Sequence, residues 1–248
     1  MTVALITGAV GGLGPAIARR LAAAGHVVAL SDLPRRELTA LAAELGGIAA
    51  PADVSDPQAV ETMVDDVRER TGEHTGILVA GAAHLAMAPF AEHDLDDWWR
   101  VLDVCLGGTF ACVQAVLPGM VERGGGRMVL LSSEWGLIGW PGATAYSAAK
   151  AGTIALTKSF GRELGPLGIA VNAVAPGPVD SALLEVNAAA AGVSTEEIRA
   201  RHAGRTPLGR IASPEEVADA VAFLADARLP TLLGQILHVN GGSTRARA

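Results

Sequence analysis

Short apolar segments alternate with longer amphipathic segments along the whole chain. The short segments are strand-sized, and they cover residues 3–6, 27–30, 47–50, 77–80, 128–131, 169–174 and 236–239. The longer segments carry apolar residues at helical spacing, and they cover residues 57–70, 95–122, 146–164 and 214–225. Cap residues mark several helix starts, such as Ser213 before Pro214.

This alternation predicts parallel strands joined by right-handed helical crossovers. The expected fold class is α/β: a Rossmann-like, doubly wound, seven-stranded parallel sheet with helices on both faces. No long polar linker or internal repeat divides the sequence, so we predict a single domain over residues 1–248. Ligands bind such sheets at the carboxyl ends of the strands, so residues that directly follow a strand are the candidates for function.

The net charge and the N-terminal residues indicate which partners and which cellular location to expect. A formal net charge of -7 argues against binding nucleic acid or an anionic membrane, because both need an excess of Lys and Arg. The first residues lack the basic segment and cleavage site of a secretory signal, and glycines or charges interrupt the apolar runs before membrane-spanning length. We expect a cytoplasmic protein with neither a nucleic-acid nor a membrane partner.

Two cysteines, Cys105 and Cys112, fall in one predicted helix. Their spacing separates them by roughly 10 Å along the helix axis, too far for a disulfide. The sequence also shows no Cys/His cluster at metal-ligand spacing, so we predict no metal site. Both features suit a reducing compartment.

A glycine-rich segment stands between the first predicted strand and the helix after it. Residues 7–14 read TGAVGGLG. Glycines at such a turn let the backbone approach a pyrophosphate, while the helix N-terminus supplies N–H donors. The alternative is a tight strand-to-helix connection with no ligand. The candidate phosphate-binding residues are Gly8, Gly12, Leu13 and Gly14.

Asp32 ends the second predicted strand, close to the roughly twenty residues after the turn at which a ribose-binding acid is expected. Its carboxylate can accept hydrogen bonds from both ribose hydroxyls, and its charge would repel a 2′-phosphate. Its neighbour Leu33, a further candidate for cofactor contact, offers no neutralising cation. We therefore expect NAD rather than NADP. Arg35 and Arg36 qualify this choice, although at a helix start they fit solvated surface charges.

Tyr146 and Lys150 lie one helical turn apart, on one face of a predicted helix. A tyrosine ordinarily titrates near pH 10, so it can act as a base at neutral pH only if a nearby cation lowers its pKa. Lys150 is placed to do so. An i,i+4 pair of this kind is also common on helices, where it has no catalytic role.

With these motifs in order, the chain resembles the short-chain dehydrogenase/reductase family, whose signatures are a T-G-x-x-x-G-x-G turn and a Y-x-x-x-K pair. The likeness covers nearly the whole length. Ser133 stands where the family places the serine that hydrogen-bonds the reacting oxygen. Further family-like segments are Asp53-Val54 after the third strand, Pro176-Gly177 after the sixth, and the C-terminal residues 234–242.

The resemblance implies roles for individual residues. Asp53 and Val54 would contact adenine, Val179 and Ser181 would hold the nicotinamide carboxamide, and Lys150 would bond the nicotinamide ribose. In alcohol oxidation, Tyr146 would take the hydroxyl proton, Ser133 would polarise the oxygen, and hydride would pass to the nicotinamide. Reduction would run these steps backwards.

The chain departs from the family at two places. The family's N-N-A-G segment after the fourth strand lacks both asparagines here, although Ala80 and Gly81 keep the small residues that let a cofactor lie against the strand end. Cys105 replaces the catalytic-tetrad asparagine, whose backbone carbonyl holds a relay water in the family. We interpret Cys105 as a small buried residue rather than a nucleophile, because a nucleophile needs a lowered thiol pKa.

Residues 182–207 resemble the family's variable substrate lid. The residues that could face a substrate are His84, Trp135, Trp140 and Leu183, a mostly apolar set that suits a hydrophobic or cyclic molecule. Packing alone would also explain the two tryptophans, and His84 would also fit an ordinary loop histidine.

We expect an NAD-dependent enzyme that transfers hydride between nicotinamide and a secondary alcohol or ketone. The alternatives are a carbonyl reductase of the 3-oxoacyl-thioester or polyketide type and, from another class, a non-catalytic NAD-binding scaffold. The family resemblance also implies a homotetramer assembled through the helices at 95–122 and 146–164.

Overall fold

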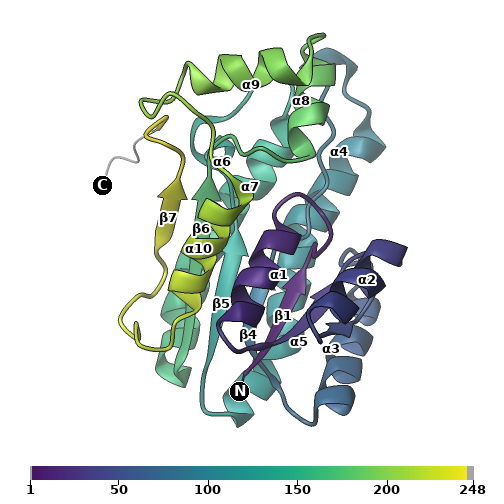
Figure 1. Cartoon of the computed structure of the whole chain (residues 1–248), viewed down its shortest axis with the longest axis vertical. Helices are drawn as coiled ribbons and strands as arrows, with labels where there is room; N and C mark the ends of the chain where they lie inside the picture. Colours follow the sequence, from purple (N-terminus) through teal and green to yellow (C-terminus); the bar gives the residue numbers. More distant parts are fainter. Residues whose placement is uncertain (1, 245–248) are drawn as a thin grey trace.

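The computed structural model describes residues 2–244. Across these residues seven parallel strands form one sheet in the order β3-β2-β1-β4-β5-β6-β7 (Figure 1). The strand order reverses between β1 and β4, which confirms the predicted doubly wound topology. The strands are β1 (Val3–Thr7), β2 (Val27–Ser31), β3 (Ile48–Ala49), β4 (Thr75–Ala80), β5 (Gly126–Leu131), β6 (Ile169–Pro176) and β7 (Ile236–Val239).

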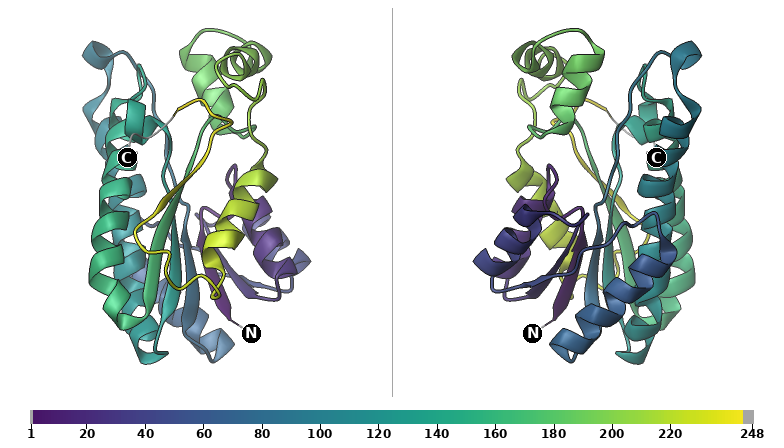
Figure 2. Two further views of the ribbon diagram at one scale, coloured as in Figure 1. Left: turned by 90° about the vertical axis from the view of Figure 1, so that its left-hand side faces the viewer. Right: turned by 90° about the vertical axis from the view of Figure 1, so that its right-hand side faces the viewer.

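Helices cover both faces of the sheet, as Figure 2 shows edge-on. One face carries α1 (Gly14–Ala23), α2 (Arg36–Glu44) and α10 (Pro214–Ala225), and α1 packs directly on α10. The other face carries α3 (Pro57–Thr71), α5 (Gly108–Glu122) and α7 (Thr144–Leu164). The remaining helices are α4 (Leu95–Leu102), α6 (Trp135–Ile138), α8 (Leu183–Ala190) and α9 (Thr195–Ala203).

The sheet is buried on both sides, which explains its unbroken apolar strands. All positions of β1, β4 and β6 are buried. Their side chains alternate between two cores: Leu5 packs with the helices on the α5 face, and Ile6 packs with those on the α1 face. This arrangement fixes the strand ends, from which the functional loops leave.

The predicted helix at residues 95–122 is interrupted. A π-helical segment, Asp103–Gly107, joins α4 to α5 and carries Cys105. The wider π turn changes the directions in which its side chains point. Such segments are frequent at functional sites.

Taken as one unit, Leu95–Glu122 is long and apolar enough to cross a membrane, so the expectation that glycines and charges interrupt every such run was wrong. Half of its most apolar stretch is buried inside the protein, and α5 packs against β4 and α3. A core helix that packs on a sheet can be equally long and apolar, so the length and composition of this segment fit its place in the fold.

Two helices, α8 and α9, stand over the carboxyl ends of the strands, at the top of Figure 1. They fill most of the segment expected to form a substrate lid. Ser194 caps α9 by accepting a hydrogen bond from the Glu197 N–H at 3.1 Å. An ion pair between Arg199 on α9 and Asp180 below it, with 2.6 Å between the charged atoms, joins the lid to the loop after β6.

Candidate active site

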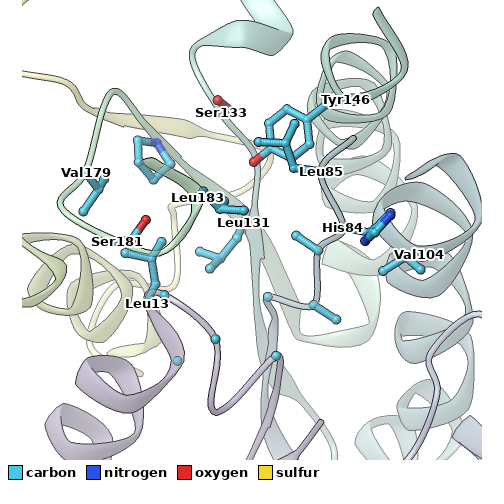
Figure 3. A pocket seen from close by; sticks show the side chains of 18 of the residues that line it. Leu13, His84, Leu85, Val104, Leu131, Ser133, Tyr146, Val179, Ser181 and Leu183 are labelled. Atoms are coloured by element: carbon cyan, nitrogen blue, oxygen red, sulfur yellow. The ribbon is translucent and has the colours of Figure 1, made fainter. Parts of the chain in front are cut away.

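A cavity of about 340 Å³ opens at the carboxyl ends of β1, β4, β5 and β6, beneath the lid (Figure 3). It lies at the point where the strand order reverses, which is the ligand-binding position of a doubly wound sheet. Its size suits a small-molecule site.

The glycine-rich turn forms the floor of the cavity. Gly8 has a φ of +70°, a left-handed conformation that favours glycine. At Gly14, an added Cβ would lie 2.2 Å from the Gly8 carbonyl oxygen, so only glycine lets α1 begin this close to β1. The turn therefore leaves room and helix N–H groups for a phosphate, and it fits the pyrophosphate of a dinucleotide.

Asp32 stands at the end of β2, beside this turn. Its carboxylate accepts hydrogen bonds from the Val10 N–H (3.2 Å) and the Leu33 N–H (2.9 Å), which hold it at the cavity wall. Arg35 lines the same wall. The sequence predicted Asp32 as a cofactor-binding residue, and it lines the cavity. Arg35 is exposed, as expected of a surface charge, and also lines the cavity, where it qualifies the choice of NAD.

Asp53 and Val54 line the cavity on the far side of the turn. Both carboxylate oxygens of Asp53 are engaged: Ser55 donates to one, and the Arg100 guanidinium lies 2.9 Å from the other. Although burial raises the pKa of Asp53, the hydrogen bonds from Ser55 and Arg100 outweigh it and bring the pKa to about 2. Arg100 itself lines the cavity and had no sequence signal, because it comes from α4.

The end of β6 and the loop after it form the opposite wall, which contains all four predicted residues: Pro176, Gly177, Val179 and Ser181. It is held in place by the Gly177 N–H, which donates to the Val239 carbonyl at 3.0 Å, and by pairing of Val179 with Ala212. Ser181 crosses over the glycine-rich turn, where a Cβ added to Gly12 would lie 3.2 Å from its Cβ. Figure 3 shows Ser181 above Leu13.

The structure brings Ser133, Tyr146 and Lys150 into this same cavity. Ser133 follows β5, while Tyr146 and Lys150 lie in the first turns of α7. The Ser132 hydroxyl donates to the Lys150 carbonyl at 2.9 Å and so fastens the strand end to the helix. In Figure 3 the phenol hydroxyl points into the cavity. Ser133 Oγ accepts from the Trp135 N–H at 3.2 Å, and its own O–H remains available to a ligand.

The electrostatics of the pair differ from the expectation. Lys150 Nζ lies 5.4 Å from the phenol ring centre and donates to the Leu131 carbonyl at 2.6 Å. Both side chains are buried. Burial raises the pKa of the Tyr146 phenol above its usual range and lowers the pKa of the Lys150 ammonium. The predicted lowering of the phenol pKa by Lys150 was therefore wrong for the protein alone, because desolvation dominates.

Sequence comparisons agree with this geometry. The family model for "Enoyl-(Acyl carrier protein) reductase" matches residues 8–244. A 3-oxoacyl-[acyl-carrier-protein] reductase FabG of Thermotoga maritima is 35% identical over 245 residues, which cover 97% of this chain and 96% of the relative. The chain belongs to the short-chain dehydrogenase/reductase family.

Two further relatives are similar over comparable lengths. The cis-4-hydroxycyclohexanecarboxylate dehydrogenase of Sinomonas cyclohexanicum is 39% identical, over 98% of this chain and 96% of the relative. Nodulation protein G of Azospirillum brasilense is 37% identical, over 97% of each chain. The chain is therefore an oxidoreductase of this family, with a nicotinamide cofactor and a small-molecule substrate.

The structure shows which hydrogen bonds hold the chain at its two departures from the short-chain dehydrogenase/reductase pattern. Where the paired asparagines are missing, the Thr7 hydroxyl accepts hydrogen bonds from the N–H groups of Gly81 (3.1 Å) and Ala82 (3.3 Å). Gly81 lines the cavity as predicted, but Ala80, also predicted as a cofactor contact, does not line the cavity and is buried in β4, inside the α5-face core.

Cys105 also does more than fill space. Its thiol donates to the His84 carbonyl (3.3 Å) and accepts from the His84 N–H (3.4 Å), which holds the loop after β4 to the π-helical segment. Its own carbonyl accepts a hydrogen bond from the Thr109 hydroxyl at 2.8 Å. The thiol is fully buried, so the interpretation of Cys105 as structural rather than nucleophilic fits its place.

Of the predicted substrate residues, His84, Trp135 and Leu183 line the cavity, and Trp140 does not. Trp140 instead stacks on Trp135 with 4.9 Å between ring centres and 4° between ring planes. The Trp135 ring also contacts the Tyr146 ring edge-on, with 5.9 Å between the two ring centres.

The structure adds two polar lid residues, Asn187 on α8 and His202 on α9. The alanine-rich lid sequence gave no signal for either of them.

Proposed function

We propose that this chain is an NAD-dependent enzyme that transfers hydride between nicotinamide and a secondary alcohol or ketone of a small, apolar or cyclic molecule. The observation that carries the proposal is the convergence of Ser133, Tyr146 and Lys150 in one cavity with the glycine-rich turn. When bound, the nicotinamide would accept or donate the hydride.

The protein's own groups would manage the reacting oxygen and its proton. The Tyr146 hydroxyl, which points into the cavity, would exchange the proton as general acid or base. The Ser133 O–H would donate to the reacting oxygen and orient it, while Lys150 would bind the nicotinamide ribose. Because burial raises the pKa of Tyr146, the phenol holds its proton at neutral pH and is ready to donate it to a carbonyl oxygen.

NAD is the proposed cofactor because the Asp32 carboxylate lines the wall beside the glycine-rich turn. A 2′-phosphate placed there would meet its negative charge. Arg35 lies in the same wall and would reduce that repulsion. The contacts proposed for Asp53 and Val54 with adenine, and for Val179 and Ser181 with the carboxamide, follow from the family and from their positions around the cavity.

A 3-oxoacyl-thioester reductase is the second candidate. One observation favours it: the relative from Thermotoga maritima carries that name. The dehydrogenase from Sinomonas cyclohexanicum, with a cyclic hydroxy acid in its name, favours the first candidate equally.

One screen tests the proposal. A set of secondary alcohols and their ketones, including cis-4-hydroxycyclohexanecarboxylate and an acetoacetyl thioester, is assayed with NAD and NADP in parallel through nicotinamide absorbance. The proposal predicts turnover of a small alcohol or ketone with NAD. Turnover of the thioester alone would establish the second candidate, and activity only with NADP would overturn the cofactor choice.

We also propose a cytoplasmic, single-domain enzyme that assembles as a homotetramer. The outward face of α4 and α5 exposes large apolar side chains that water would disfavour and that a second copy would cover, namely Leu95, Trp99, Phe110 and Val121. Analytical ultracentrifugation at micromolar concentration should give a tetramer, and a monomer would contradict the assembly.

A further inference from the structure

The lid contains a polar pair that the proposed chemistry does not use. His202 Nε2 lies 2.8 Å from Asn187 Oδ1, which joins α9 to α8. The two residues are 3% and 4% exposed, yet both line the cavity. A buried polar pair costs stability unless its hydrogen bonds are made, and an apolar contact would join two helices equally well. A ligand that binds these polar groups would explain their presence at this buried position.

The pair has unused hydrogen-bonding capacity. An Asn side chain carries two N–H donors and an imidazole has a second ring nitrogen. Among residues 2–244, the one hydrogen-bond acceptor of the Asn187 amide nitrogen is the Met87 sulfur, a weak acceptor, at 3.6 Å. Its second N–H and the second imidazole nitrogen therefore remain available to a ligand with strong acceptors.

The charge around the cavity favours an anion at this end. Among the described lining residues, the only carboxylates are Asp32 and Asp53, which belong to the glycine-rich-turn end. Arg205 lies 5.0 Å over the ring of Trp140, and Trp140 contacts the His202 ring at 5.4 Å. Burial lowers the pKa of His202, and the positive charge of Arg205 lowers it further, so this cation acts on the imidazole. A bound anion would be attracted by Arg205 and would favour protonation of His202.

We propose that Asn187 and His202 form a subsite for a substrate carboxylate, with the positive charge of Arg205 close by, over the Trp140 ring. The inference rests on the proposed function: the molecule that is oxidised or reduced at Tyr146 is then a hydroxy acid or keto acid. Trp135 and Trp140 connect the phenol to the imidazole through ring contacts. An apolar carbon skeleton along Trp135 would separate the reacting carbon from the carboxylate.

The test compares acids with their neutral esters. Secondary hydroxy acids with increasing separation between hydroxyl and carboxylate, from 3-hydroxybutyrate upward, are each paired with their methyl ester. Both kcat/KM and binding by tryptophan fluorescence are measured in the presence of NAD. We expect at least one acid to be preferred over its ester by about 10- to 100-fold, the range of one or two charge-assisted hydrogen bonds.

Variants localise the preference. Asn187→Leu and His202→Phe should remove it by weakening the acid while leaving the ester within about threefold. Turnover of the ester then shows that each variant is folded. Arg201→Gln is the matched control, because it removes a positive charge from α9 at an exposed position paired with Glu197. It should leave the preference unchanged.

Each outcome separates the subsite from the catalytic proposal. Equal use of acids and esters would overturn the subsite while leaving the oxidoreductase function in place. Tight binding of acids without turnover of any pair would support the subsite and contradict the proposed reaction. Loss of acid and ester binding alike in Asn187→Leu would assign the pair a merely structural role and overturn the inference.

Discussion

The two halves of the cavity are built in different ways. The half around the glycine-rich turn is made of backbone: N–H groups, strand ends and a helix start, with Asp32 held by the Val10 and Leu33 amides. The lid half is made of side chains from separate elements, such as His202 against Asn187, and Trp135, on which Trp140 stacks from outside the cavity. Backbone binds what is common to all dinucleotides, whereas side chains can be exchanged to suit one substrate. The first half therefore serves the cofactor, and the second sets specificity.

The largest expected effect comes at the junction of the two halves. Tyr146→Phe removes the proton that we assign to the reacting oxygen, so turnover should fall by about 100- to 10,000-fold, the range of general acid–base catalysis. NAD affinity, measured by calorimetry, should stay within about threefold, because the change adds no bulk. Unchanged turnover would remove the proposed mechanism.

A charge change at Asp32 should act only through the cofactor half. Asp32→Asn keeps the side-chain shape and removes the repulsion toward a 2′-phosphate, so the preference for NAD over NADP should fall by about tenfold or more. The kcat/KM for both cofactors is the measurement. Asp65→Asn is the control, because this acid is exposed on α3 and does not line the cavity. An identical shift in both variants would point to net charge rather than to Asp32.

The glycine turn can be tested through stability with two matched positions. Gly14→Ala places a Cβ 2.2 Å from the Gly8 carbonyl oxygen, whereas in Gly11→Ala the same atom would be 3.7 Å away. Overpacking of this kind costs about 1–3 kcal/mol, so Gly14→Ala should lower Tm by several degrees. Gly11→Ala should change it little. Thermal unfolding followed by circular dichroism decides, and equal Tm values would contradict the close approach.

The smallest effect is expected on the lid side, at Trp140. Trp140→Phe thins the stack that supports Trp135, and we expect the KM for the alcohol substrate to rise about three- to tenfold. Cofactor affinity should not change, because Trp140 does not line the cavity. If Trp140→Phe weakened NAD binding more than it raised the substrate KM, the result would contradict the division of the cavity into a cofactor half and a substrate half.

The sequence predicted the backbone-built half well and the lid half poorly. Regular strands and helices set the spacing of Asp32 after the glycine turn and of Lys150 after Tyr146. Such spacings can be recognised in the amino-acid sequence alone. Asn187 and His202 meet only because α8 and α9 fold against each other, and no local motif marks them.

The errors have the same origin. Trp140 was expected to face the substrate, but the turn of α6 stacks it on Trp135 instead. Cys105 is buried, as expected, but the sequence did not predict its hydrogen bonds to the backbone of His84, which lies on another loop. The contact between Cys105 and His84 joins residues that are 21 positions apart, and the tryptophan stack depends on how the chain turns after α6; hydrophobic patterning encodes neither.

Isotope transfer tests the central claim most directly. A secondary alcohol that the enzyme accepts is labelled with deuterium on the carbinol carbon and incubated with the enzyme and NAD, and the reduced cofactor is analysed by mass spectrometry. We predict that the deuterium appears on the nicotinamide ring with the unmodified enzyme and not with Tyr146→Phe over the same period. A reduced cofactor without the label, or equal labelling by both proteins, would contradict hydride transfer at the site formed by Ser133, Tyr146 and Lys150.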